Sequence, residues 1–242
     1  VLASLVASLP GDASASKPDS AVDLVALYKR IYKSFIEHID GMDNGIEARD
    51  GKKNYEVPTT LSSRISALNP RWNEPGDSAE INRRFVAAMS LVGEELSEAV
   101  DFAVNSWWPA RSLVAAAMDG ASDVHPSRQI LILSRACPWQ SHLFQLEEER
   151  AAAGDAALAG AAKYVVFPDS KGAGWRIQGV PVQEDSFSTR RPLPESWRGL
   201  RGVALSDLVG TEGCIFVHAG GFIGGHESRE GVIAMALKAI GA

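Results

Sequence analysis

Hydrophobic positions three and four residues apart predict helices through the first half of the chain. One apolar face is expected between residues 28 and 39, a short helix between residues 59 and 69, and a longer stripe between residues 81 and 100. The side chains expected to share the first face are Tyr28, Ile31, Tyr32, Phe35, Ile36 and Ile39. A Trp-Trp-Pro step at residues 107–109 is expected to break or kink the long helix, which then continues to about Met118.

The pattern changes near residue 120, where a loop with glycine and proline precedes β-rich segments. Expected strands are residues 129–134, 163–167, 175–182 and 214–217, and expected helices are residues 139–150 and 228–240. The second and third strands are predicted to form a hairpin, and Ser228 to cap the last helix. The sequence therefore predicts an α/β protein with a mainly helical part, residues 1–120, and an α/β part, residues 121–242.

Composition narrows the possible functions. Hydrophobic residues make up 45% and charged residues 22%, which is ordinary for a globular protein. The net charge of −6 does not favour nucleic acid, so an anionic substrate needs a local basic patch. Two distant cysteines make neither a disulfide framework nor a zinc motif. No apolar run approaches a membrane span, and no targeting signal is visible in residues 1–17.

The segment from Cys214 to Ile240 reads as strand, glycine-rich loop and helix. Gly220, Gly221, Gly224 and Gly225 would let the backbone approach a ligand closely. The helix start favours anions, and His218, His226 and Arg229 could reach a phosphate there. A tight turn that only lets the helix pack explains the glycines equally well, and the motif by itself implies no nucleotide.

A basic stretch follows the predicted hairpin. Its arginines are Arg190, Arg191, Arg198 and Arg201, and Arg176 precedes them on a strand. Such a patch can bind a phosphate backbone while Trp197 stacks on a base. The alternative is a solvated loop whose arginines pair with Glu184, Asp185 and Glu195.

Two carboxylates, Asp40 and Asp43, lie at the predicted end of the first long helix. Carboxylates can bind a hard cation, but two do not fill a coordination sphere. An exposed helix end explains them as well. His38, His125 and His142 are scattered, and no Ser/His/Asp or Cys/His arrangement can be identified, so no catalytic residue is assigned.

Six blocks of the sequence resemble the melanocyte proliferating gene family, a branch of the DHH phosphoesterases. They are IDGMDNGI (39–46), TTLSSRISALNPRWN (59–73), CPWQSHLFQLEEE (137–149), WRIQGVPV (175–182), RRPLPESWRGLRG (190–202) and CIFVHAGGFIGG (214–225). They lie in the family's order and cover nearly the whole chain from about residue 24. The resemblance is to the C-terminal two-thirds of such proteins.

The resemblance implies a catalytic α/β domain with a pair of divalent metals, Mn²⁺ or Mg²⁺, and a smaller domain with a glycine-rich substrate loop. It implies a 3′→5′ RNA exonuclease of mitochondria and nucleus, and a cytoplasmic location is the alternative. An older label is metal-dependent protein hydrolase. Residues 1–120 would be the remainder of the DHH-type catalytic domain, and residues 121–242 the substrate-binding domain.

This chain departs from the family because the HxDxxxCDE-type motif and the DHH motif are absent from it. The resemblance maps the last metal-site motif to Asp43, with Asp40 as the other choice. It assigns substrate contacts to the glycine loop with His218 and His226. The remaining candidates for substrate phosphates are Arg64, Arg176, Arg198 and Arg229.

The intact protein is therefore expected to be a metal-dependent phosphoesterase that degrades RNA or an oligonucleotide, and this chain alone is expected to be inactive. Its partners would be that substrate and the N-terminal part of the same protein. The alternatives are a non-catalytic nucleic-acid-binding module and a hydrolase of small phosphoesters. The sequence does not set the oligomeric state, but helices that lack the rest of their domain are expected to expose apolar surface and to self-associate.

Overall fold

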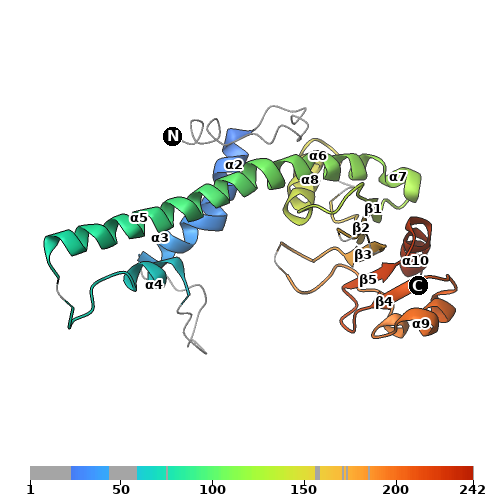
Figure 1. The fold of residues 1–242 in the computed structure, drawn as a ribbon. Helices are drawn as coiled ribbons and strands as arrows, with labels where there is room; N and C mark the ends of the chain where they lie inside the picture. Colours follow the sequence, from blue (N-terminus) through green and yellow to red (C-terminus); the bar gives the residue numbers. More distant parts are fainter. Residues whose placement is uncertain are drawn as a thin grey trace. The chain divides into compact units, whose positions relative to one another are not determined.

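A computed structural model of the chain describes residues 23–43, 59–74, 76–155, 159–170, 172, 174–184 and 186–241. The chain divides between Trp108 and Pro109 into two compact units (Figure 1). Helix α6 (Trp108–Asp119) packs in a core of the second unit, whereas the sequence places it before the boundary. Helices and a five-stranded sheet confirm the α/β class, while the assignment of the two parts to DHH-type domains stays a prediction.

The regular secondary structure among the described residues of the first unit is helical. They form α2 (Leu24–Ile31), the π-helical η1 (Tyr32–Ile36), α3 (Glu37–Asp43), α4 (Leu61–Ser66), α5 (Ser78–Asp101) and the π-helical η2 (Phe102–Trp107). Side-chain oxygens of Asp23, Thr60 and Asp77 accept backbone N–H groups at the starts of α2, α4 and α5. In the described part of the chain, no helix is both long and apolar enough to cross a membrane.

The residues buried in the core of the first unit are not all those of the apolar face predicted between residues 28 and 39. Leu27 and Ile31, one turn apart on α2, pack with residues of α5 and η2 and with Trp108, the last residue of the first unit. Tyr28 and Tyr32 are instead exposed, and their rings stack 6.2 Å apart. The prediction was wrong for these tyrosines because the contact with η2 uses the neighbouring stripe of the helix.

The Trp-Trp-Pro step does not interrupt the helical backbone. The π-helical turn η2 lies directly before Trp108, and α6 starts there with Pro109 as its second residue. Proline has no N–H to donate, so it is tolerated in the first turn of a helix. The expected break is therefore absent, and local π-helical geometry takes its place.

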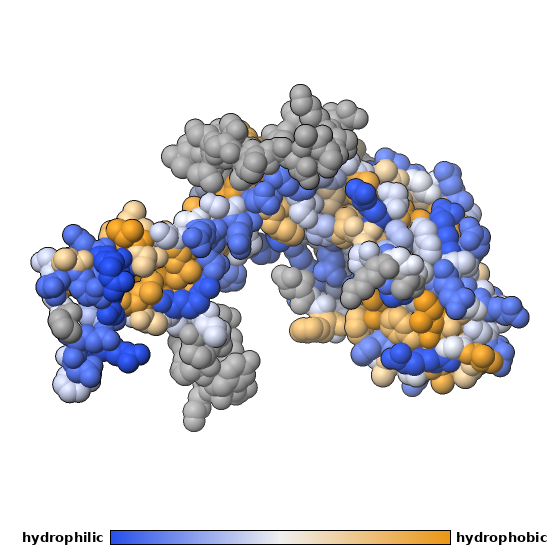
Figure 2. Space-filling view, in the orientation of Figure 1, coloured by the Kyte–Doolittle hydropathy of each residue, from blue (hydrophilic) through white to orange (hydrophobic). Residues whose placement is uncertain are grey.

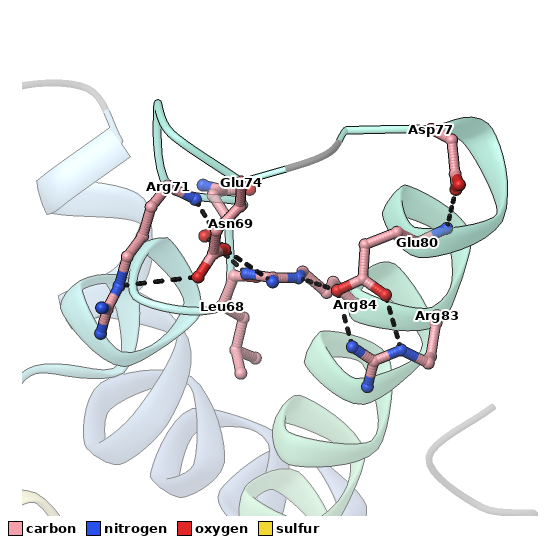
Figure 3. A network of polar contacts seen from close by, with 8 residues as sticks. All are labelled: Leu68, Asn69, Arg71, Glu74, Asp77, Glu80, Arg83 and Arg84. Carbon is pink, nitrogen blue, oxygen red and sulfur yellow. Dashed lines mark hydrogen bonds and ion pairs between the residues drawn. The ribbon is translucent and has the colours of Figure 1, made fainter.

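Polar contacts hold the loop between α4 and α5 against the start of α5 (Figure 3). Arg84 donates to Glu80 and, across 2.8 Å, to Glu74, and its Nη1 also donates to the carbonyl of Asn69. Arg83 donates to both oxygens of Glu80, at 2.8 and 2.6 Å. Hydrogen bonds from Arg83 and Arg84 lower the pKa of Glu80 to about 2.

The apolar stripe predicted on α5 is largely exposed. Ile81, Phe85 and Met89 expose 50%, 63% and 59% of their surface. Figure 2 shows apolar surface on the first unit. The helix of this stripe is confirmed, but its burial by the described residues is not.

The second unit contains a sheet with the strand order β1-β2-β3-β5-β4. Strands β1 (Ile130–Ile132) and β2 (Tyr164–Pro168) pair in parallel, and the other neighbours pair antiparallel. The predicted hairpin is confirmed, with β2 joined to β3 (Trp175–Gly179). Helices α7 (Ala121–Val124) and α8 (Gln140–Ala152) flank β1 in the sequence.

The end of the chain differs from the predicted strand, loop and helix. Strand β4 (Cys214–Val217) is followed by a turn and by an additional strand, β5 (Ile223–His226), before α10 (Arg229–Gly241). Gly224 and Gly225 therefore lie in a strand between β3 and β4, and not in a loop. Helix α9 (Gly202–Val209), which the sequence pattern did not predict, follows the short 3-10 turn η4 (Glu195–Trp197).

Two cores lie on the two faces of the sheet. The first contains Ile130, Tyr164 and Ile177 together with apolar residues of α9 and α10. The second contains Leu131 and Val165 together with apolar residues of α6 and α8. Trp197 belongs to the first core and is only 6% exposed, so the hypothesis that it stacks on a base was wrong.

Candidate nucleic-acid interface

One face of strands β3, β5 and β4 lies outside both cores. The second core, on that side of the sheet, includes no side chain of β5 or β4. Arg176 on β3, Gly225 on β5 and Phe216 on β4 are consecutive cross-strand partners. Because directly paired residues point to the same face of a sheet, these three positions form one strip across it.

A β-bulge brings Phe216 to this strip. Cys214 pairs with His226, but Phe216 pairs with the preceding residue, Gly225, so Ile215 is the extra residue. Without the bulge, Phe216 would share the face of Cys214, which is buried in the first core. Bulges of this kind redirect side chains and are frequent next to functional sites.

Two guanidinium groups flank the ring of Phe216. The Cζ atoms of Arg176 and Arg201 lie 5.6 and 5.7 Å from its centroid. Arg176 donates to Asp169 across 2.7 Å, and Arg201 is exposed. We call Arg176, Arg201, Phe216 and Gly225 the arginine–phenylalanine face.

Glycine at position 225 allows this close arrangement. A Cβ atom there would lie 2.9 Å from Nη1 of Arg176 and 3.0 Å from the ring of Phe216. On the opposite face, a Cβ at Gly224 would lie 3.1 Å from the carbonyl oxygen of Phe216 and 3.2 Å from Leu193. Both glycines are thus explained by close packing within a sheet.

The turn between β4 and β5 brings together four other predicted residues. The backbone N–H of Gly220 donates to Nδ1 of His218 at 3.0 Å, and that of Gly221 to the His218 carbonyl at 2.8 Å. Gly221 has a φ of +68°, and a Cβ there would lie 2.7 Å from Nε of Arg198. Arg198 itself donates to the Leu193 carbonyl at 3.0 Å. His218 and Arg198 therefore support the turn, and their proposed contacts with substrate stay predictions.

His226 and Arg229 lie on the other side of the sheet. His226 is 2% exposed, and its Nδ1 accepts the backbone N–H of Ser228 at 3.0 Å. Its ring packs on Gly231, where a Cβ would lie only 1.9 Å from Cε1. Arg229 lies over the ring of Trp175, which pairs with His226 on the same face. The structure therefore separates these two residues from Arg176.

The remaining candidates belong to the first unit. Asp40 is exposed on α3, and Asp43 is the last residue of that helix, with its side chain outside the described atoms. Arg64 on α4 forms an ion pair with Glu95 on α5. Among the described residues, no group of three or more His, Cys, Asp or Glu side chains could hold a metal ion. These residues alone therefore do not fit a metal pair.

Comparison with known proteins identifies the family to which the chain is similar. The model of the Uncharacterised protein family (UPF0160), labelled MYG1 exonuclease, matches residues 10–240. The chain is 46% identical to the MYG1 exonuclease of Bos taurus over 87% of this chain and 53% of the relative. It is 45% identical to the MYG1 exonuclease of Homo sapiens over 91% of this chain and 56% of the relative.

The MYG1 protein of Dictyostelium discoideum is 42% identical over 92% of this chain and 65% of its own length. The chain thus spans between 53% and 65% of the length of these three relatives. No solved structure matches the chain.

Proposed function

Because this chain belongs to the UPF0160 family together with the MYG1 exonucleases, we propose that it is part of a hydrolase that cleaves phosphodiester bonds in RNA. Its second unit would hold the RNA. The observation that supports this role is the placement of Arg176 and Arg201 on either side of Phe216, on a part of the sheet outside both cores.

Phosphate binding on this face follows from charge and geometry. Guanidinium groups form paired, charge-assisted hydrogen bonds with phosphate oxygens. The whole chain carries a charge of −6, so attraction of RNA has to be local. Contact between Arg176 and Asp169 orients one guanidinium, while Arg201 is exposed to approaching phosphates. The turn with His218, Gly220 and Gly221 would border the bound strand.

We further propose that the intact protein is a metal-dependent 3′→5′ exonuclease that uses Mn²⁺ or Mg²⁺ and acts in mitochondria and nucleus. A pair of divalent ions would activate water and stabilise charge on the phosphate. Asp43 is the ligand proposed from this chain, and the other ligands would come from residues outside the described ranges or from the rest of the intact protein.

The test uses the full-length protein and a 5′-labelled RNA oligonucleotide with Mn²⁺. We expect the protein to shorten the RNA from its 3′ end, and Asp43→Ala to abolish the shortening. Arg201→Gln is expected to weaken RNA binding and to lower the slope of log K against log salt by about 0.7, which corresponds to the loss of one phosphate contact on a single strand. Arg111→Gln, which removes the same charge from the pair with Glu149, is the matched control.

The outcomes separate the alternatives. RNA binding without shortening would support the non-catalytic binding module. Hydrolysis of small phosphoesters without RNA shortening would support the third hypothesis. Equal RNA affinity of the Arg201→Gln and Arg111→Gln variants would contradict the arginine–phenylalanine face as the RNA site.

A further inference from the structure

A cleft of about 700 Å³ lies in the second unit, at the end of the sheet where β1 ends and β3 begins. Its walls come from the end of α6, from α7, from the residues that follow β1, and from the start of α10. Trp175 lines it and directly precedes Arg176 on β3. Because successive side chains of a strand point to opposite faces, the Trp175 ring and the Arg176 guanidinium lie on opposite faces of the sheet.

An aromatic ring and a cation meet in the cleft. The Cζ atom of Arg229 lies 5.9 Å from the ring centroid of Trp175, and both residues line the cavity. Trp175 is half-buried and Arg229 is exposed, so each presents surface to a ligand. An indole stacks on flat π systems, and a guanidinium binds phosphate or carboxylate.

Part of the lining of the cleft consists of small residues. Ala116, Ala117 and Gly120 of the α6 end line the cleft. A Cβ on Gly120 would meet only the Ala116 carbonyl oxygen, at 3.6 Å, so the space beside Gly120 is open. Apolar side chains that include Val124 and Ile233 complete the lining. These small residues leave room for a flat ring in the same cleft as the Trp175 indole.

We propose that this cleft binds a nucleoside monophosphate, with the base beside Trp175 and the phosphate at Arg229. The volume lies within the roughly 300–1,000 Å³ usual for small-ligand sites. Asp123, at the same cleft, only accepts hydrogen bonds when ionised and would suit ribose hydroxyls rather than a second phosphate. This site is distinct from the proposed RNA interface and does not rest on it.

The test is titration calorimetry of the 242-residue chain with AMP, adenosine and inorganic phosphate. We expect AMP to bind more tightly than adenosine or phosphate, because only AMP supplies both the ring and the charge. Arg229→Gln is expected to weaken the binding of AMP by about tenfold, which is the effect of losing one charge-assisted contact. The affinity for adenosine is expected to stay unchanged. Trp175→Leu is expected to weaken the binding of both AMP and adenosine.

A steric variant keeps the test informative if Trp175→Leu does not fold. Ala116 is exposed on α6, so Ala116→Phe narrows the cleft without adding volume to a core, and it is expected to abolish binding. Absence of AMP binding to a cooperatively melting wild-type chain would overturn the proposal. So would loss of AMP binding in Arg201→Gln, a residue that does not line the cleft, with retention in Arg229→Gln and Ala116→Phe. Failure of RNA shortening would contradict the proposed function and leave this result untouched.

Discussion

Arg190 donates two parallel hydrogen bonds to Glu147, from Nη1 to Oε1 and from Nη2 to Oε2, each across 2.7 Å. Their side chains are only 11% and 6% exposed, and the guanidinium lies 4.9 Å from the ring of Phe144. The pair joins the segment after β3 to helix α8. Arg190 therefore has a structural partner that is none of the three acids considered from the sequence.

We predict that Glu147→Ala destabilises the second unit by about 3–5 kcal/mol, because it leaves a buried guanidinium without its counter-ion. Urea denaturation followed by far-UV circular dichroism would measure the change. Glu149→Ala is the control on the same helix, since its carboxylate is 57% exposed in a pair with Arg111 and should contribute less than about 1 kcal/mol. Equal losses in the two variants would contradict this account.

The close packing of the His226 ring on Gly231 gives a second prediction about stability. Gly231→Ala would place a Cβ 1.9 Å from the imidazole, and forced overpacking of this kind costs about 1–3 kcal/mol. The double variant Gly231→Ala/His226→Ala has no imidazole ring for the new Cβ to meet. Its loss of unfolding free energy should therefore be smaller than the sum of the losses in the two single variants. Gly93→Ala is the matched change on α5, where a Cβ meets nothing within 4 Å, and it should stabilise by roughly 0.5–1 kcal/mol. If the double variant loses as much unfolding free energy as the two single variants together, the contact between position 231 and His226 is contradicted.

Stability of the second unit should fall in alkaline solution. Burial raises the pKa of the Cys137 thiol from 9.0 to about 11, and it raises the pKa of the Tyr164 hydroxyl from 10.0 to about 12. Since both pKa values are raised in the folded state, the stabilisation is complete below pH 9 and is lost as pH rises through 11 and 12. Urea midpoints at several pH values would measure this. Cys137→Ala should flatten the loss between pH 9 and 11, and an unchanged profile would contradict the assignment to this thiol.

The exposed stripe on α5 predicts self-association of this chain. Phe85 and Met89 expose 63% and 59% of their surface, and exposed apolar patches drive association. Sedimentation velocity should show concentration-dependent oligomers, and Phe85→Glu with Met89→Glu should shift the chain towards monomer. Arg83→Glu, on the same helix but already in a polar network, is the control. A monodisperse wild-type monomer would contradict the prediction.

The sequence by itself determined the local elements. Alternating β-formers on either side of a glycine-containing turn predicted the hairpin of β2 and β3, and Ser228 was recognised as a cap. The Ser228 hydroxyl indeed accepts the backbone N–H of Gly231 at 3.1 Å. These features depend on neighbours a few residues away, so they can be read from short segments. The six family blocks also led to the family that the comparisons confirm.

Only the tertiary structure decided where the chemistry lies. Strand β5 has two central glycines and no alternation, so its existence depends on pairing with β3 and β4. The bulge at Ile215 sets the face of Phe216, and one shift of register would move every side chain to the other side. The same pairing buries His226 beneath α10 and leaves Arg176 on the opposite face. Such choices depend on contacts between distant segments, and a pattern of residue types along the chain does not contain them.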